Sequence, residues 1–153
     1  MTEKILILDF GSQYTQLIAR AVREANIYCE IIPFHKAFTI DPTLKGIILS
    51  GSPFSVNEDN APSVDIASFI AQLPVLGVCY GAQLTAKVFG GKVDKSNKRE
   101  YGRAQLDIQQ QDQLFNGISL KSQVWMSHGD TIKEVPDNFE IIASTADVRV
   151  AGY

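Results

Sequence analysis

The first half of the chain alternates short apolar runs with segments of helical periodicity. Residues 4–9 form a continuous apolar run, which is typical of a strand buried on both faces of a parallel sheet. Similar runs recur at residues 28–33, 46–50 and 75–78. Apolar residues at helical spacing occupy residues 14–25, 65–73 and 80–89. This alternation predicts an α/β fold with an open, mostly parallel twisted sheet and helices on both faces.

The pattern changes after the glycine pair at residues 90–91, which we expect to end the last of these helices. The following segment, residues 92–103, is polar and charged. Beyond it we expect strands at residues 104–109, 123–127, 139–144 and 148–153, with a helical turn at residues 112–117. Because these strands are short and close together, they predict an antiparallel extension on the parallel core.

Length and composition are those of an ordinary globular domain, so we expect residues 1–153 to form one domain. The chain is 45% hydrophobic and 20% charged. A net charge of −3 supplies no basic stripe for nucleic acid, and no apolar run approaches the roughly 20 residues of a membrane span. The N-terminus enters a strand pattern directly and lacks the features of a signal peptide, so we expect a cytoplasmic location.

The chain has two cysteines, Cys29 and Cys79, in different surroundings. Two thiols cannot form a disulfide framework or a four-thiolate zinc site, and we expect no metal site. Apolar neighbours surround Cys29, which favours a packing role. Cys79 instead stands where an apolar run passes straight into a helical pattern, between Gly77 and Gly81. That is the pattern of a nucleophile elbow, although a buried cysteine that merely packs would give the same local sequence.

A cysteine nucleophile needs a base, and the chain has two histidines. His35 follows a strand on an expected surface loop, and we assign it no chemistry. His128 lies in Trp-Met-Ser-His-Gly-Asp, with Asp130 two residues on. On local pattern alone, Cys79, His128 and Asp130 could form a triad. Alternatively, residues 127–130 form a turn that binds a ligand, and His128 stabilises it.

Five motifs in order carry a resemblance to a known family. They are Asp9-Phe10-Gly11-Ser12-Gln13-Tyr14-Thr15, Ser50-Gly51-Ser52-Pro53, Gly77-Val78-Cys79-Tyr80-Gly81-Ala82-Gln83, Arg99-Glu100-Tyr101-Gly102 and Trp125-Met126-Ser127-His128-Gly129-Asp130. Their order and spacing resemble the class I glutamine amidotransferase domain, in its GMP synthetase branch. The resemblance spans nearly the whole chain.

The resemblance implies a role for each residue of the expected site. Cys79 would attack the side-chain amide of glutamine, release ammonia and form a glutamyl thioester that water hydrolyses to glutamate. The backbone amide of Tyr80 and one from Gly51 or Ser52 would stabilise the developing oxyanion. The substrate-binding residues implied by the motifs are Gln83, Ser127, His128 and Asp130. Ser127 and His128 would act mainly through their backbone, and Asp130 would bind the substrate ammonium group.

Two departures from the family pattern bear on activity. The family loop usually reads Ser-Gly-Gly-Pro, and Ser52 replaces its second glycine, so the oxyanion site needs a backbone conformation that suits a Cβ. The family's catalytic histidine and glutamate lie in a His-Pro-Glu motif, which residues 1–153 do not contain. We therefore expect a domain cut at its C-terminus, without its base and with little activity alone.

The resemblance also implies partners. In such enzymes the ammonia feeds the ATP-dependent amination of XMP to GMP by an ATP-pyrophosphatase domain of the same chain. We expect no cofactor for the amidotransferase domain itself, ATP and Mg²⁺ only for the synthetase domain, and a homodimer for the full-length enzyme. The synthetase and dimerisation domains are expected to lie outside residues 1–153.

Two alternatives remain open at this point. The loop at residues 11–15 could cradle a phosphate in a flavodoxin-like nucleotide-binding module, although it has one glycine and no glycine-rich fingerprint. Another elbow-cysteine hydrolase, such as a γ-glutamyl peptidase, would share the Cys79 pattern, but the motif at residues 125–130 argues against it.

Overall fold

The computed structural model describes residues 2–153, without the side chains of residues 97–100. The chain divides into two compact units, Met1–Val88 and Phe89–Tyr153, and each is described by itself. The side chains of Arg99 and Glu100, from the fourth sequence motif, lie outside the described residues.

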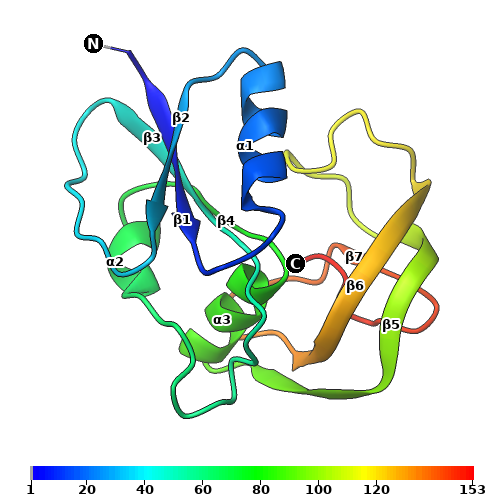
Figure 1. Cartoon of the computed structure of the whole chain (residues 1–153). Helices are drawn as coiled ribbons and strands as arrows, with labels where there is room; N and C mark the ends of the chain where they lie inside the picture. Colours follow the sequence, from blue (N-terminus) through cyan, green and yellow to red (C-terminus); the bar gives the residue numbers. More distant parts are fainter. Residues whose placement is uncertain (1) are drawn as a thin grey trace. The chain divides into compact units, whose positions relative to one another are not determined.

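The first unit is built on a four-stranded parallel sheet in the order β2-β1-β3-β4 (Figure 1). Its elements, in chain order, are β1 (Lys4–Asp9), α1 (Thr15–Glu24), β2 (Cys29–Pro33), β3 (Leu44–Leu49), α2 (Ile66–Ile70), β4 (Val75–Gly77) and α3 (Tyr80–Val88). Every strand and helix predicted for this half of the chain is present. β1 has the predicted bounds, and α2 is shorter than predicted because residues 72 and 73 close a turn on the Phe69 carbonyl.

The strand order explains the continuous apolar runs and locates the site. The centre of β1, Leu6 to Leu8, is at most 3% exposed because other elements cover both faces of the sheet. From β1 the chain crosses to β2 on one side, and from β3 it crosses to β4 on the other. Since parallel crossovers are right-handed, this reversal places α1 and α2 on opposite faces. Ligands of such sheets bind at the carboxyl ends of the strands where the order reverses, here β1 and β3.

The second unit is an antiparallel sheet in the order β6-β5-β7 (Figure 1). Antiparallel strands were predicted for this part of the chain. Its strands are β5 (Lys92–Ile108), β6 (Lys121–Glu134) and β7 (Ala143–Ser144). β5 and β6 are much longer than predicted. The polar segment at residues 92–103 belongs to β5, because a long two-stranded ribbon can leave one face in solvent and does not need apolar residues at every second position.

Two predictions for the end of the chain were wrong in extent. Residues 139–144 contribute only the two-residue β7, because Asn138 adopts a left-handed conformation and the Phe139 amide closes a turn on the Pro136 carbonyl. Residues 148–153 form no strand of their own and contribute an isolated bridge between Gly152 and Ala143. The turn predicted at residues 112–117 is present, and Gly117 ends it with a positive φ.

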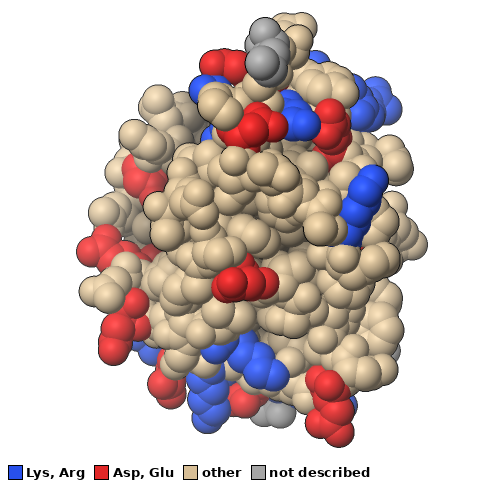
Figure 2. Space-filling model, turned by 90° about the vertical axis from the view of Figure 1, so that its left-hand side faces the viewer, with Lys and Arg blue, Asp and Glu red and all other residues tan. Residues whose placement is uncertain are grey.

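No helix in the part of the chain that the structure describes is long and apolar enough to cross a membrane. On the face shown in Figure 2, charged side chains of both signs are scattered among the described residues, and neither sign gathers into a patch.

Candidate active site

Cys79 lies between β4 and α3 in a strained backbone conformation. Its φ is +53°, in the left-handed region, and its side chain is exposed. For a residue with a Cβ this conformation costs about 1–2 kcal/mol, so the surrounding structure must enforce it. The Val78 amide donates to the Leu49 carbonyl (2.9 Å), and the Gln83 amide donates to the Cys79 carbonyl (3.0 Å). The strand, turn and helix of a nucleophile elbow are therefore present.

The two glycines flanking Cys79 allow the backbone to pack closely. A Cβ on Gly77 would lie 2.6 Å from the Ala82 nitrogen, and one on Gly81 would lie 2.6 Å from the Leu49 Cβ. Carbon atoms in contact are normally about 3.5–4.0 Å apart, so neither position tolerates a side chain without movement. The Gly-x-Cys-x-Gly spacing thus reflects α3 packing directly on the ends of β3 and β4.

The loop after β3 lies beside Cys79. A Cβ built on Gly51 would lie 3.8 Å from the Cys79 Cβ and 3.3 Å from the Ser12 Oγ. The segments that follow β1, β3 and β4 therefore meet at one place, at the carboxyl edge predicted for a site. Among the described residues, the positive φ values outside glycine belong to Asn26, Cys79 and Asn138. Ser52 consequently has a backbone conformation that accommodates its Cβ, in spite of the glycine usual in the family.

Tyr80 anchors the start of α3 through its side chain. The ring is buried and packs on Phe10, with ring centroids 5.5 Å apart, and the hydroxyl donates to the Pro62 carbonyl. Burial, with a smaller contribution from the Glu58 charge, raises the pKa of Tyr80 to about 12. The Tyr80 backbone amide belongs to the first turn of α3, where amides have no partner within the helix. Gln83 lies one turn further and is buried.

The remaining predicted site residues, Ser127, His128 and Asp130, lie in the second unit. The structure contradicts the alternative in which residues 127–130 form a turn, since β6 continues through them to Glu134. Alternation along the strand places His128 and Asp130 on one side and Ser127 on the other. His128 Nδ1 lies 2.7 Å from the Asp130 backbone oxygen.

Because each unit is described by itself, no distance connects these three residues with Cys79. Their role in substrate binding and the local triad of Cys79, His128 and Asp130 both stay predictions. Within the first unit, Gly51 lies beside Cys79, and Tyr80 and Gln83 follow it in α3. The chemical roles of these residues and of Ser52 stay predictions.

Two residues were given no chemical role from the sequence. Cys29 is buried in β2, and its thiol donates to the Ala19 carbonyl, as expected of a packing role. His35 follows β2 and its ring contacts the edge of Phe34. In the described part of the chain, no group of three or more His, Cys, Asp or Glu side chains could hold a metal ion.

Sequence reasoning missed the polar contacts that hold the loops of the site. Asp9 Oδ1 accepts from the Gly11 amide (2.9 Å) and from Thr15 Oγ1 (2.8 Å), which fixes the loop after β1. Ser50 is completely buried, and its hydroxyl joins the ends of β1 and β3. The signal in the sequence was a small polar residue directly after an apolar strand.

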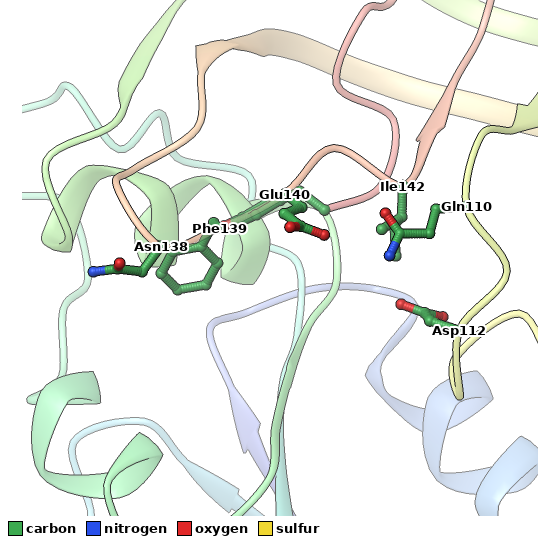
Figure 3. Close-up of a pocket in the computed structure, with 7 residues that line it drawn as sticks. Gln110, Asp112, Asn138, Phe139, Glu140 and Ile142 are labelled. Carbon is green, nitrogen blue, oxygen red and sulfur yellow. The ribbon is translucent and has the colours of Figure 1, made fainter.

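The second unit has an open pocket of about 530 Å³ that does not include Cys79. It is lined by Gln110, Asp112, Asn138, Phe139, Glu140, Ile142 and Tyr153. Figure 3 shows Gln110 and Asp112 on one side and Asn138 and Phe139 on the other. Asp112 already accepts hydrogen bonds from the Leu114 and Phe115 amides, so part of its capacity serves the local turn.

Comparison with known proteins identifies the family. The model of the family "Glutamine amidotransferase class-I" matches residues 6–153. The chain therefore belongs to the class I glutamine amidotransferase family, and neither the flavodoxin-like nor the peptidase alternative is favoured.

Curated relatives are similar over the whole chain. It is 65% identical to a GMP synthase [glutamine-hydrolyzing] of Cytophaga hutchinsonii and 55% identical to one of Phocaeicola vulgatus. Each match covers 100% of this chain and 30% of the relative, so the chain spans about a third of the length of these relatives.

Solved structures share the fold. A Thermoplasma acidophilum protein, described as part of a GMP synthase, has a TM-score of 0.79 and 30% identity, over 98% of this chain and 76% of that one. A glutamine amidotransferase of Thermotoga maritima has a TM-score of 0.74 at 19% identity, over 97% and 69% of the two chains, which shows the fold alone. The predicted fold class is confirmed.

Proposed function

We propose that this chain is the glutamine-hydrolysing part of a GMP synthase and that Cys79 is its nucleophile. The observation that carries the proposal is the elbow itself: an exposed cysteine held at positive φ between a strand and a helix, with the Gly51 loop beside it. The 65% identity to a glutamine-hydrolysing GMP synthase supports the choice of substrate.

The reaction begins with the Cys79 thiolate adding to the side-chain amide carbon of glutamine. Negative charge then collects on the amide oxygen, which accepts hydrogen bonds from the Tyr80 amide and from the amide of Ser52 or Gly51. The carbon–nitrogen bond breaks, and the nitrogen takes up a proton and leaves as ammonia. Water then attacks the γ-glutamyl thioester, which releases glutamate and restores the thiol.

The position of Cys79 also favours the thiolate. It immediately precedes α3, a nine-residue helix whose first-turn amides point toward the turn. The positive end of the helix dipole lowers the energy of a negative charge there, both on the sulfur and on the developing oxyanion. This arrangement assists the first step whichever residue serves as the base.

We assign substrate specificity to the residues that the family motifs imply. Gln83 is buried one helical turn beyond Cys79, where it can contact bound glutamine. In the second unit, Ser127 and His128 offer backbone groups, and the carboxylate of Asp130 matches the ammonium group of an amino acid. Such a set would distinguish glutamine from a simple amide.

The greater length of the relatives supports a proposal for the partners of the whole protein. We propose that the ammonia passes to a synthetase domain of a longer chain, which aminates XMP to GMP with ATP and Mg²⁺, and that the full-length enzyme is a cytoplasmic homodimer. The second unit offers a surface for such a partner. Tyr101 and Trp125 are 62% and 72% exposed on the β5–β6 ribbon, and Trp125 pairs with Arg103.

The general base that activates Cys79 is still to be assigned. The family's His-Pro-Glu motif does not occur in residues 1–153. We propose that the histidine and glutamate are supplied by residues after Tyr153 in a longer chain. The competing assignment is the local triad in which His128 acts as the base.

Selective labelling tests the proposal without requiring turnover. A chloroketone analogue of glutamine should alkylate Cys79 at a pH that ionises the thiol, and glutamine should slow the reaction. Cys29 is the internal control because it is buried in β2. Peptide mass spectrometry distinguishes the two cysteines. Equal labelling of Cys29 and Cys79, without protection by glutamine, would contradict the proposal.

A further inference from the structure

We propose that Ser50 is a positioning residue whose buried hydroxyl orients the peptide between Gly51 and Ser52, so that the Ser52 amide points at the oxyanion. The inference rests on the proposed function, because it assigns a task within the same site.

Ser50 is 0% exposed, and each of its polar groups is used. Its amide donates to the Leu8 carbonyl (3.1 Å), and its carbonyl accepts from the Gly81 amide (3.1 Å). Its hydroxyl accepts from the Phe10 amide (3.0 Å) and donates to the Gly51 carbonyl (2.9 Å). One residue therefore joins the end of β1, the first turn of α3 and the loop beside Cys79.

The bond to the Gly51 carbonyl determines the direction of the Ser52 amide. Both groups belong to one peptide unit, which is planar and trans, so the C=O and N–H bonds point in opposite directions. Fixing the carbonyl toward the interior therefore turns the Ser52 N–H the other way. A hydroxyl has one proton to donate, and Ser50 gives it to this carbonyl.

Gly51 itself allows the close approach that this arrangement needs. A Cβ at Gly51 would contact Ser12 Oγ at 3.3 Å and the Cys79 Cβ at 3.8 Å. Glycine also has the greatest freedom in φ and ψ, so the peptide planes beside it turn most easily and an external restraint on the carbonyl matters most here. The Ser50 hydroxyl supplies that restraint, and its Phe10 contact ties the hydroxyl to β1.

The oxyanion role predicts a particular kinetic effect of Ser50→Ala. Complete loss of an oxyanion donor lowers the catalytic rate by about 100-fold to 1000-fold. Ser50→Ala keeps the Ser52 amide and removes only its restraint, so we expect a smaller loss, about tenfold. Attack on the chloroketone analogue of glutamine places the ketone oxygen at the oxyanion position. The rate constant for inactivation at saturation should fall by this factor, and the half-saturating concentration should change less than about twofold.

Iodoacetamide separates this role from a merely structural one. It alkylates the thiol by direct displacement of iodide, with no charge developing on a carbonyl in the site. Its rate with Cys79 should therefore be the same in Ser50→Ala and the unmodified chain. Thr43→Val is the matched control, since it removes a hydroxyl bonded to Asp41 just before β3, at the opposite end of the strand. It should leave both rates unchanged.

The outcomes distinguish the inference from the proposed function. If the unmodified chain shows no glutamine-protected labelling of Cys79, the proposed function fails. The inference is overturned if the unmodified chain is labelled and the chloroketone inactivates Ser50→Ala at the same saturated rate. It is also overturned if Ser50→Ala slows the reactions with the chloroketone and with iodoacetamide by the same factor.

If Ser50→Ala does not fold, its normally buried Cys29 will react with the reagents. A second measurement, which does not need this variant, then tests the inference. In the ¹⁵N-labelled unmodified chain, the Ser52 amide proton should move downfield when the chloroketone adduct forms. An unmoved Ser52 resonance, with Gly51 moving instead, would overturn the inference by itself.

Discussion

Gly81→Ala sets two physical effects against each other in the elbow. Gly81 lies inside α3, and alanine is favoured over glycine in a helix by about 1 kcal/mol. The added Cβ would, however, lie 2.6 Å from the Leu49 Cβ and 2.9 Å from its carbonyl carbon. Leu49 is a completely buried residue of β3, so the obstacle is backbone and core rather than the end of a flexible side chain.

The steric effect should win. Relief of the contact to about 3.5 Å requires α3 and β3 to separate by roughly 0.9 Å. Forced separation of well-packed elements costs about 1–3 kcal/mol, and here it also breaks the hydrogen bond from the Gly81 amide to the Ser50 carbonyl (3.1 Å). A hydrogen bond contributes about 1 kcal/mol, so the expected net loss of unfolding free energy is about 2 kcal/mol after the helix-propensity gain.

Urea unfolding measures this loss. With a slope of about 2 kcal/mol per molar, the unfolding midpoint should fall by about 1 M. Gly46→Ala is the matched control in β3, because its Cβ would first meet Ile5 Cδ1 at 3.2 Å, the movable end of a side chain. Its midpoint should change by less than half as much. A Gly81→Ala midpoint equal to or above that of the unmodified chain would refute the close packing of α3 on β3.

Three further outcomes are expected. Tyr80→Phe should lower the unfolding free energy by about 1 kcal/mol, because it leaves the Pro62 carbonyl without its donor. In an absorbance titration it should also remove the tyrosine whose pKa is raised to about 12, and an unchanged titration would contradict the burial of Tyr80. The hydrogen bond from Lys4 lowers the pKa of Glu30, so the stability from this pair is present above the ordinary glutamate pKa and is lost as the pH falls through the lowered pKa of Glu30. The urea midpoints of the unmodified chain and Glu30→Gln should therefore converge in acid, and a difference that stays constant with pH would contradict the pairing. The 153-residue chain should release little glutamate from glutamine, and rapid release abolished by His128→Ala would instead establish the local triad.

The first unit could be predicted closely because its burial leaves a clear pattern. A strand covered on both faces must be apolar throughout, so the run at residues 4–9 gave the bounds of β1 correctly. The elbow was equally predictable, since Gly77 and Gly81 are required by contacts that any side chain would violate. The positive φ of Cys79 follows from that same local geometry.

The second unit could not be predicted as well because pairing, rather than burial, determines its strands. Much of β5 is polar, and its length depends on the register with β6, which no local pattern specifies. Ser50 was missed for a related reason. Its importance lies in partners from two other segments, the end of β1 (Leu8 and Phe10) and the first turn of α3 (Gly81), which only the fold brings together.

The measurement closest to the central claim is a protection curve for Cys79. The rate of Cys79 alkylation by the chloroketone analogue should fall along a saturable curve as glutamine is added, while the labelling of Cys29 does not change. Asparagine, whose amide is one methylene closer to the α-carbon, should protect far less. Loss of the protection curve, or equal protection by asparagine, would contradict the claim that Cys79 is the nucleophile of a glutamine site.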